Sequence, residues 1–266
     1  MRNDLEIITK EFPHKQNVLR VYAIGDVHVG SEQFDEDALK KKLKHIREDP
    51  CGVLCLCGDL GDYGLKNSKT NVYKETMPPQ EQQKYLRKLF EPVKDKIIAA
   101  VPGNHEERIT KEVGTCPLYD LCVLWGVPEA YRENLAILKL MFGNRHGSRQ
   151  QQMFIGVVTH GSNRTRNKRF ISGFDGIDFA ISGHTHTPEY VPHGKIRIDR
   201  IHGTADHVPY KELVVDANLT LGGYGIKKEY EILPPPELQY FELSAIRDKD
   251  KNRTDRRIID YHSLTL

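Results

Sequence analysis

The sequence has no long hydrophobic run, no excess of charge of one sign, and few cysteines. No apolar stretch approaches the roughly 20 residues that span a membrane, so no membrane contact is expected. Lysine and arginine total 39 against 37 acidic residues, so the net charge gives no argument for a nucleic-acid partner. The N-terminal residues lack the apolar core of a secretory signal. The five cysteines are an odd number and show no disulfide framework. Together with the lack of a secretory signal, they favour a reduced cytoplasmic compartment.

Three of the cysteines lie close together in the sequence, at Cys51, Cys55 and Cys57. A zinc site is one interpretation of them, but a C-x3-C-x-C spacing is not typical of zinc ligands. The alternation of Cys55 and Cys57 with apolar residues predicts a buried strand instead.

The first half of the 266 residues alternates short apolar runs, each ending in glycine or Pro-Gly, with helical patterns. Strands are expected at 18–24, 52–57 and 96–101, and helices at 36–46 and 81–90. In the first helix Leu39, Leu43 and Ile46 recur at helical spacing, which puts the lysines on the other face. This alternation indicates βαβ units and a mostly parallel sheet.

The second half is rich in strand signals and poor in helix signals. Strands are expected at 136–142, 153–160, 177–182, 195–201, 212–217, 238–243 and 256–261. The fold class predicted is therefore α/β, with two sheets in a single domain over 1–266. A core of about 18–190 bears the polar motifs, and the strands of 191–266 complete the sheets.

Aspartate, histidine and asparagine follow five of the predicted strands. These residues are Asp26, His28, Asp59, Asp62, Asn104, His105, His160, His184 and His186. Ligands of parallel α/β sheets gather outside the carboxyl ends of the strands, so we expect these side chains to converge. In an extended chain residues i and i+2 point the same way, which would aim Asp26 and His28 at one point.

Carboxylate and imidazole together suit borderline divalent ions such as Mn, Fe, Zn, Ni or Co. Seven of these residues are too many for one catalytic ion with an open position, and fit two ions that share a carboxylate. The seven are Asp26, His28, Asp59, Asn104, His160, His184 and His186. Two neighbouring ions form a clamp for in-line displacement at phosphorus.

In order, the motifs D-x-H, GD, GNH[DE], a lone histidine and GHxH resemble those of the calcineurin-like metallophosphoesterases. The resemblance covers about 18–187. It implies a two-sheet sandwich flanked by helices, and hydrolysis of phosphomonoesters or phosphodiesters by a hydroxide that bridges two divalent ions. Manganese is the first choice of metal, with Fe, Zn, Ni or Co as alternatives.

The resemblance also implies individual roles. One ion would be held by Asp26, His28 and His186, the other by Asn104, His160 and His184, with Asp59 bridging them and His105 beside the scissile phosphate. His105 would stabilise charge and protonate the leaving oxygen. His184 and His186 would then contact different ions although they share a strand end.

Simpler interpretations exist for the same residues. Asp26 and Asp59 follow glycine and could shape turns. Asn104 could cap a helix, and His105 could be structural. Asp62 could orient a ligand or only shape its loop. The presence of the whole set in order favours the metal interpretation.

Two positions differ from the motifs of the protein Ser/Thr phosphatases in this superfamily and so disfavour that subfamily. Val29 precedes Gly30 in the first motif, and Tyr63 replaces the arginine typical of protein Ser/Thr phosphatases. The pattern resembles the broad bacterial and viral class, which includes nucleases, cyclic-nucleotide phosphodiesterases and nucleotide hydrolases. A phosphoester substrate, such as a nucleotide or nucleic acid, is the partner expected, and the oligomeric state is not predicted.

A basic segment favours the alternative of a DNA or RNA nuclease. Its cations are Lys139, Arg145, Arg149, Arg164, Arg166, Lys168 and Arg169. Arg164 or Arg166 could grip phosphate at the mouth of the site, or lie in a solvated loop. A non-catalytic interaction module is the last alternative, and it should have lost ligands.

Overall fold

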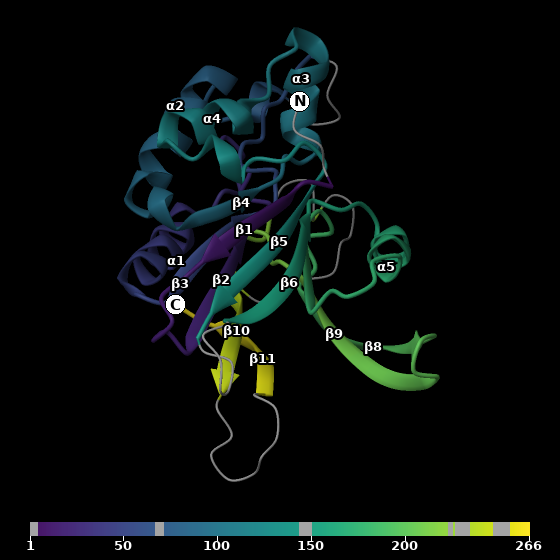
Figure 1. Cartoon of the computed structure of the whole chain (residues 1–266). Helices are drawn as coiled ribbons and strands as arrows, with labels where there is room; N and C mark the ends of the chain where they lie inside the picture. Colours follow the sequence, from purple (N-terminus) through teal and green to yellow (C-terminus); the bar gives the residue numbers. More distant parts are fainter. Residues whose placement is uncertain (1–4, 67–71, 144–150, 223–225, 227–234, 247–255) are drawn as a thin grey trace.

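The computed structural model describes residues 5–66, 72–143, 151–222, 226, 235–246 and 256–266. Two β-sheets face each other, and the helices α1, α2, α3 and α4 gather outside one of them (Figure 1). This arrangement confirms the predicted α/β class with two sheets flanked by helices. No helix within the described ranges is both long and apolar enough to cross a membrane.

The first sheet has five strands in the order β11-β10-β2-β3-β4. Its parallel part consists of β2 (Val18–Ile24), β3 (Gly52–Leu56) and β4 (Ile97–Ala100). The antiparallel strands β10 (Leu238–Ile246) and β11 (Arg256–Leu264) extend it from the other end of the chain. The predicted βαβ units thus lie next to strands supplied by the C-terminal part.

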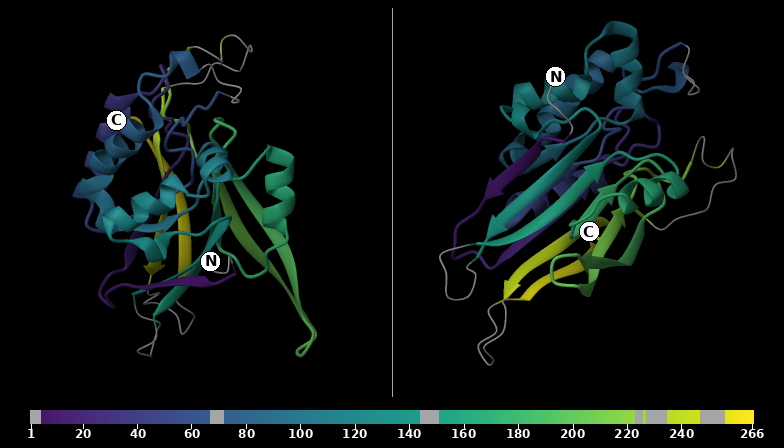
Figure 2. Two further views of the ribbon diagram at one scale, coloured as in Figure 1. Left: turned by 90° about the horizontal axis from the view of Figure 1, so that it is seen from above. Right: turned by 45° about the vertical axis from the view of Figure 1, so that its right-hand side comes forward.

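The second sheet has six strands in the order β1-β5-β6-β7-β9-β8. They are β1 (Ile7–Glu11), β5 (Leu135–Phe142), β6 (Gln152–Thr159), β7 (Phe179–Ser182), β8 (Glu189–Asp199) and β9 (Thr204–Val214). The β8–β9 hairpin projects away from the rest of the molecule (Figure 2).

One hydrophobic core lies between the sheets and a second lies under the helices. Val21 of β2 and Phe154 of β6 meet in the first, where they are fully buried. The second joins the outer face of the five-stranded sheet to α1 (Glu36–Glu48), α2 (Pro79–Phe90) and α4 (Pro117–Trp125). Burial on both faces explains why β3 and β4 are continuous apolar runs and why β2 is one from Val21 to Ile24.

Helix α1 shows how the sequence encodes this layer. The Asp35 carboxylate caps it by accepting a hydrogen bond from the Ala38 backbone N–H at 2.9 Å. Leu39, Leu43 and Ile46 pack onto the sheet as the spacing predicts. Lys42, however, is only 4% exposed, so the prediction that the lysines lie on the outer face is wrong for it.

Shorter elements complete the chain. They are α3 (Asn104–Val113), α5 (Arg164–Ser172) and the 3-10 turns η1 (Val72–Lys74), η2 (Glu91–Lys96) and η3 (Pro128–Ala130). The strand predicted at 18–24 has the predicted bounds, whereas β1 and α5 were not predicted. Arg145 and Arg149 of the basic segment lie outside the described residues.

The cysteines support the strand interpretation over the zinc interpretation. All five are free thiols, and Cys55 and Cys57 are fully buried on β3 and just after it. Burial raises the pKa of the Cys55 thiol, which disfavours the thiolate that zinc requires. No potential metal cluster among the described residues contains a cysteine.

Candidate metal centre

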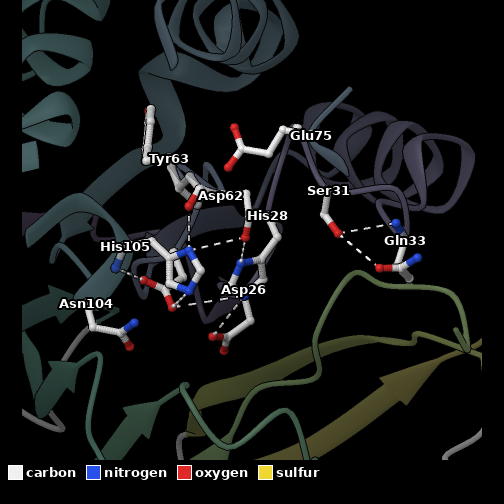
Figure 3. Close-up of polar contacts among 12 residues, drawn as sticks. Asp26, His28, Ser31, Gln33, Asp62, Tyr63, Glu75, Asn104 and His105 are labelled. Atoms are coloured by element: carbon white, nitrogen blue, oxygen red, sulfur yellow. Dashed lines mark hydrogen bonds and ion pairs between the residues drawn. The ribbon is translucent and has the colours of Figure 1, made fainter. Parts of the chain in front are cut away.

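The loops after β2, β3 and β4, and those after β6 and β7, meet at one edge of the two sheets. Figure 3 shows Asp26, His28, Asp62 and His105 with their polar ends turned toward one another. Asp26 and His28 follow β2, while Asp62 belongs to the loop after β3. The carboxyl ends of the strands therefore bring together residues that are far apart in the sequence.

Backbone hydrogen bonds hold the first two of these loops against each other. The Val27 N–H donates to the Asp59 carbonyl at 2.8 Å, and the Asp26 N–H donates to the Gly58 carbonyl at 3.0 Å. The backbone here is left-handed and not extended: φ is 49° at Asp26 and 50° at His28. The side chains converge as expected, but the alternation of an extended chain is the wrong reason for it.

The same backbone conformation recurs across the site. φ is 51° at Asp59, 74° at His184 and 56° at His186. Non-glycine residues with positive φ are uncommon, although aspartate and histidine tolerate them better than most. Such residues cluster at functional sites, where the surrounding structure holds them in place.

One group of potential ligands consists of Asp26, His28 and His186. The Nε2 atoms of His28 and His186 lie 3.1 Å apart, and the Asp26 Oδ1 lies 3.3 Å from His186 Nε2. The other Asp26 oxygen, Oδ2, accepts a hydrogen bond from the His184 N–H at 2.8 Å. Asp26 thus fixes the loop after β7 while Oδ1 points into the group.

A second group consists of Asp59, His160 and His184. His160 Nε2 lies 3.4 Å from Asp59 Oδ2, 3.1 Å from His184 Nδ1 and 3.2 Å from the Asn104 amide oxygen. The other nitrogen, His160 Nδ1, donates to the Cys57 carbonyl at 2.7 Å. This bond orients the ring so that Nε2 faces the group.

The structure therefore brings the seven predicted ligands to one place, whereas their division between two ions stays a prediction. His184 and His186 fall into different groups. Asp59 also lies within reach of the first group, since its Oδ2 is 4.0 Å from His28 Nε2. A third combination, His28, Asp59 and His105, also satisfies the distances for a metal ion.

His105 is held in place by Asp62, the residue of the loop after β3 for which two roles were considered. Its Nδ1 donates to the Asp62 carbonyl at 2.6 Å and lies 3.2 Å from the Asp62 carboxylate. The same carboxylate lies 3.2 Å from His28 Nδ1. Asp62 therefore orients two histidines, which favours the orienting role over a purely loop-shaping one.

Arg108 is a site residue that sequence reasoning missed. Its guanidinium donates to His105 Nε2 at 2.9 Å, one helical turn along α3. Because arginine is a donor only, His105 Nε2 acts as the acceptor in this arrangement. The signal available in the sequence was the i+3 spacing from His105, which puts both side chains on one face of α3.

Glu106 was also missed, and it holds the loop after β3. Its buried carboxylate accepts hydrogen bonds from the backbone N–H groups of Asp59, Leu60 and Gly103, each at 2.8 Å. Burial, and then repulsion from Asp59, raise the pKa of Glu106. The acidic residue of the GNHE motif thus builds the site without facing its centre.

Opposite charges compensate one another within the centre. Burial opposes ionisation of Asp59, but the neighbouring His160, His105 and His28 hold its pKa below the ordinary value. Burial likewise opposes protonation of His160, yet Asp59 raises its pKa to about 10. A dense set of carboxylates and imidazoles is therefore kept in a water-poor region by mutual attraction.

The residues present fit divalent ions. Asp26 Oδ1 is buried without a hydrogen-bond partner in the part of the chain that the structure describes. Two pairs of imidazole nitrogens face each other at 3.1 Å, so each pair directs nitrogen lone pairs at a common point when the rings are neutral. Mixed nitrogen and oxygen donors suit borderline transition metals.

The two arginines proposed for substrate binding lie on α5, and their described contacts are with Glu189 and Asn163. Arg164 begins α5, and its Nε lies 2.8 Å from the Glu189 carboxylate. Arg166 is exposed on the same helix, where its backbone N–H donates to the Asn163 side chain. Asn163 caps α5, so the stretch considered as a loop is a helix.

Comparisons with known proteins match a family model and, with low TM-scores, solved structures. No curated protein matches this sequence. Among solved structures, Vps29 from Chaetomium thermophilum has a TM-score of 0.38 and 10% identity, covering 93% of this chain and 97% of its own. A hypothetical protein from Thermus thermophilus has a TM-score of 0.31 and 12% identity, covering 92% and 99%. At these low scores neither likeness bears on the assignment.

The family model that matches is described as calcineurin-like phosphoesterase, and it covers residues 19–188. The matched region is more than half of the chain and contains the seven potential ligands and His105. Both groups of potential metal ligands lie within it. The chain therefore belongs to the calcineurin-like phosphoesterase family.

Proposed function

We propose that this protein is a metal-dependent hydrolase of phosphomonoester or phosphodiester bonds. The observation that carries the proposal is the pair of ligand groups that meet at Asp59, in a chain of this family. Carboxylate and imidazole side chains occur in both groups, and the seventh predicted ligand, Asn104, has its amide oxygen 3.2 Å from His160 Nε2. This completeness argues against a non-catalytic module.

In the proposed arrangement one ion is held by Asp26, His28 and His186 and the other by Asn104, His160 and His184, with Asp59 shared. Divalent ions at such positions lower the pKa of bound water and offset the negative charge of a phosphoryl group. Manganese is our first choice, with Fe, Zn, Ni and Co as alternatives.

The side chains around the ligands would position the substrate. His105, held through Nδ1 by Asp62, would lie beside the scissile phosphate and stabilise its charge. The Arg108 guanidinium donates to His105 Nε2, and a phosphoryl oxygen could accept the same N–H groups. The proposal thus places the Arg108 N–H groups at the edge of the cluster where substrate would enter, and His105 Nε2 would become a second donor there once it is protonated.

The nuclease alternative depends on α5, and the structure shows partial neutralisation there. Arg164 and Lys168 both lie within 4 Å of the Glu189 carboxylate. Arg166 is the more available of the two proposed substrate-binding arginines, because its side chain has no ion pair with any described residue. We keep Arg166, and then Arg164, as proposed contacts of a phosphate at the mouth of the site.

The test is hydrolysis of p-nitrophenyl phosphate and bis(p-nitrophenyl) phosphate by the purified protein in Mn, Fe, Zn, Ni and Co. We expect turnover of at least one substrate, and about two ions per chain by metal analysis. Loaded protein that hydrolyses neither substrate with any metal, and no member of a panel of nucleotides and oligonucleotides, would contradict the proposal.

A further inference from the structure

A second concave site lies in the helix layer, between α1 and α2 with η2. Its volume is about 480 Å³, within the usual range for small-ligand pockets. None of its lining residues belongs to the metal centre. The lining residues are Glu36, Lys40, Leu43, Lys44, Arg47, Tyr85, Lys88, Leu89 and Pro92.

The charge of this pocket is strongly biased. Four of its lining residues are cations and one is a carboxylate, whereas the whole chain has 39 cations against 37 acids. Lys40, Lys44 and Arg47 recur at helical spacing along one face of α1. Lys88 adds a cation from α2 on the other side. Three of the four cations thus follow from the helical spacing of α1, and folding adds Lys88 from α2.

Two of these four cations form no ion pair with a described residue. Lys40 is paired with Glu36, and Arg47 lies 3.5 Å from Glu48 in an exposed and therefore weak pair. Lys44 and Lys88 form no ion pair with any residue that the structure describes. The pocket thus has two free cations on opposite walls, which suits a ligand with more than one negative charge.

The rest of the pocket is apolar and partly aromatic. Leu43 is buried, Leu89 is half-buried, and the ring of Tyr85 lies with them along the wall. The Tyr85 hydroxyl donates to the Glu36 carboxylate, which fixes the ring. A flat ring against Tyr85 and a charged group between the lysines would use both parts of the pocket.

We propose that this pocket binds a nucleoside phosphate, with the base against Tyr85 and Leu89 and the phosphates between Lys44 and Lys88. Inorganic phosphate alone would use the cations but not the apolar wall. Nothing in this assignment depends on the phosphoesterase proposal, because the lining residues and the metal-centre residues are separate sets.

The test is calorimetric titration of the full chain with ATP at low salt in EDTA, which removes metal-dependent binding and hydrolysis at the strand ends. The Lys44→Gln/Lys88→Gln variant should bind ATP at least about tenfold more weakly than the wild type. Its matched control is Lys41→Gln/Lys84→Gln, which changes one exposed lysine on each of the same helices outside the pocket. The control should bind as the wild type does.

Tripolyphosphate and adenosine form the two further arms, and each should bind at least about tenfold more weakly than ATP. Equal affinity of the pocket variant and the wild type would overturn the proposal, as would equal weakening in the control variant. Tripolyphosphate binding as tightly as ATP would overturn the role of the apolar wall. Because the titrations contain no metal, a failure here says nothing about hydrolysis, and the reverse also holds.

Discussion

Two regions of this molecule bury charge, and they do so in opposite ways. At the strand ends Asp26 and Asp59 are buried among histidines that lie within 3.3 to 3.4 Å of their oxygens. On α1, Lys42 is 4% exposed but has no ion pair within 4 Å among the described residues. It interacts with Asp216, Asp35 and Glu237 only at longer range.

The difference separates a charge that is part of a site from a charge that only costs stability. A buried charge with close partners keeps its ionised form, as the low pKa of Asp59 shows. Burial of Lys42 lowers its pKa to about 8, because the distant carboxylates do not offset the loss of water. Burial alone is therefore a poor indicator of function, and close compensation is a better one.

The largest effect should come from removing the shared carboxylate of the paired region. Asp59→Asn should lower kcat/KM for the preferred aryl phosphoester by more than the roughly 100-fold that is typical of a residue orienting a ligand. The reason is that Asp59 serves both ligand groups. Metal analysis should show fewer bound ions. The exposed Asp95→Asn variant is the control, and equal activity of the two variants would refute a shared role.

Arg108 sharpens the comparison, because it is a partly buried cation whose acceptor lies inside the site. A hydrogen bond to a charged group contributes about 1.5–3 kcal/mol, so Arg108→Gln should lower kcat/KM by about 10- to 100-fold. Metal content should not change, and Arg108→Lys should restore part of the activity. Lys111→Gln, one turn further along α3, serves as the control. Loss of bound metal in Arg108→Gln would instead indicate a structural role.

Lys42→Met tests the uncompensated region. The lysine is charged in the unfolded chain up to its ordinary pKa near 10.5, but the folded pKa is about 8. Below pH 8 the folded state therefore carries the full cost of the buried charge. Between about pH 8 and pH 10.5 the free energy of unfolding of the wild type rises with pH, because the lysine is neutral in the folded state but still charged in the unfolded chain. The free energy of unfolding of the variant at pH 7 should exceed that of the wild type by up to about 3 kcal/mol.

The measurement for Lys42→Met is urea unfolding at pH 7 and at pH 10. The gain in the free energy of unfolding should shrink at the higher pH, because the wild-type lysine is then largely neutral in the folded state. Lys41→Met, on the exposed face of the same helix, is the matched control for replacing a lysine by methionine. A gain that is the same at both pH values would show that packing, and not charge, is responsible.

The smallest effect should come from exposed charge on α5. Arg166→Gln should raise KM for a phosphodiester by no more than about fivefold, the scale of one exposed ion pair. Arg164→Gln should have a smaller effect, because Glu189 already pairs with Arg164. Steady-state kinetics at low and high salt would measure both. A large loss in either variant would mean that charge at the mouth matters as much as charge in the buried centre.

The sequence was sufficient for the two-sheet α/β class and for the convergence of the polar residues at the strand ends. Apolar runs buried on both faces, such as β3 and β4, are continuous and therefore easy to delimit. The short strand β1 was not predicted, because only Ile8 of its residues is buried. The helix α5 was not predicted, because it buries only Asn167 and Ile171 and so has almost no apolar periodicity. Weak burial leaves a weak pattern in the sequence.

Contacts between distant segments could not be read in the same way. Helical spacing put Lys42 on a polar face, but the segment that bears Asp216 and Glu237 comes from the far end of the chain. The α1–α2 pocket likewise joins lysines from two helices, whereas the obvious basic run on α5 is partly neutralised by Glu189. Local charge depends on which elements meet, and a single sequence does not state that.

The backbone is left-handed at five potential metal ligands, so the residue type that favours stability there differs from the type that can bind a metal ion. These residues are Asp26, His28, Asp59, His184 and His186. A left-handed conformation costs an L-residue about 1–2 kcal/mol, and glycine is free of this cost. Selection for heat resistance alone would therefore favour glycine at these positions and erase the centre. Aspartate and histidine at these positions keep the potential metal-ligand side chains at the cost of this backbone strain.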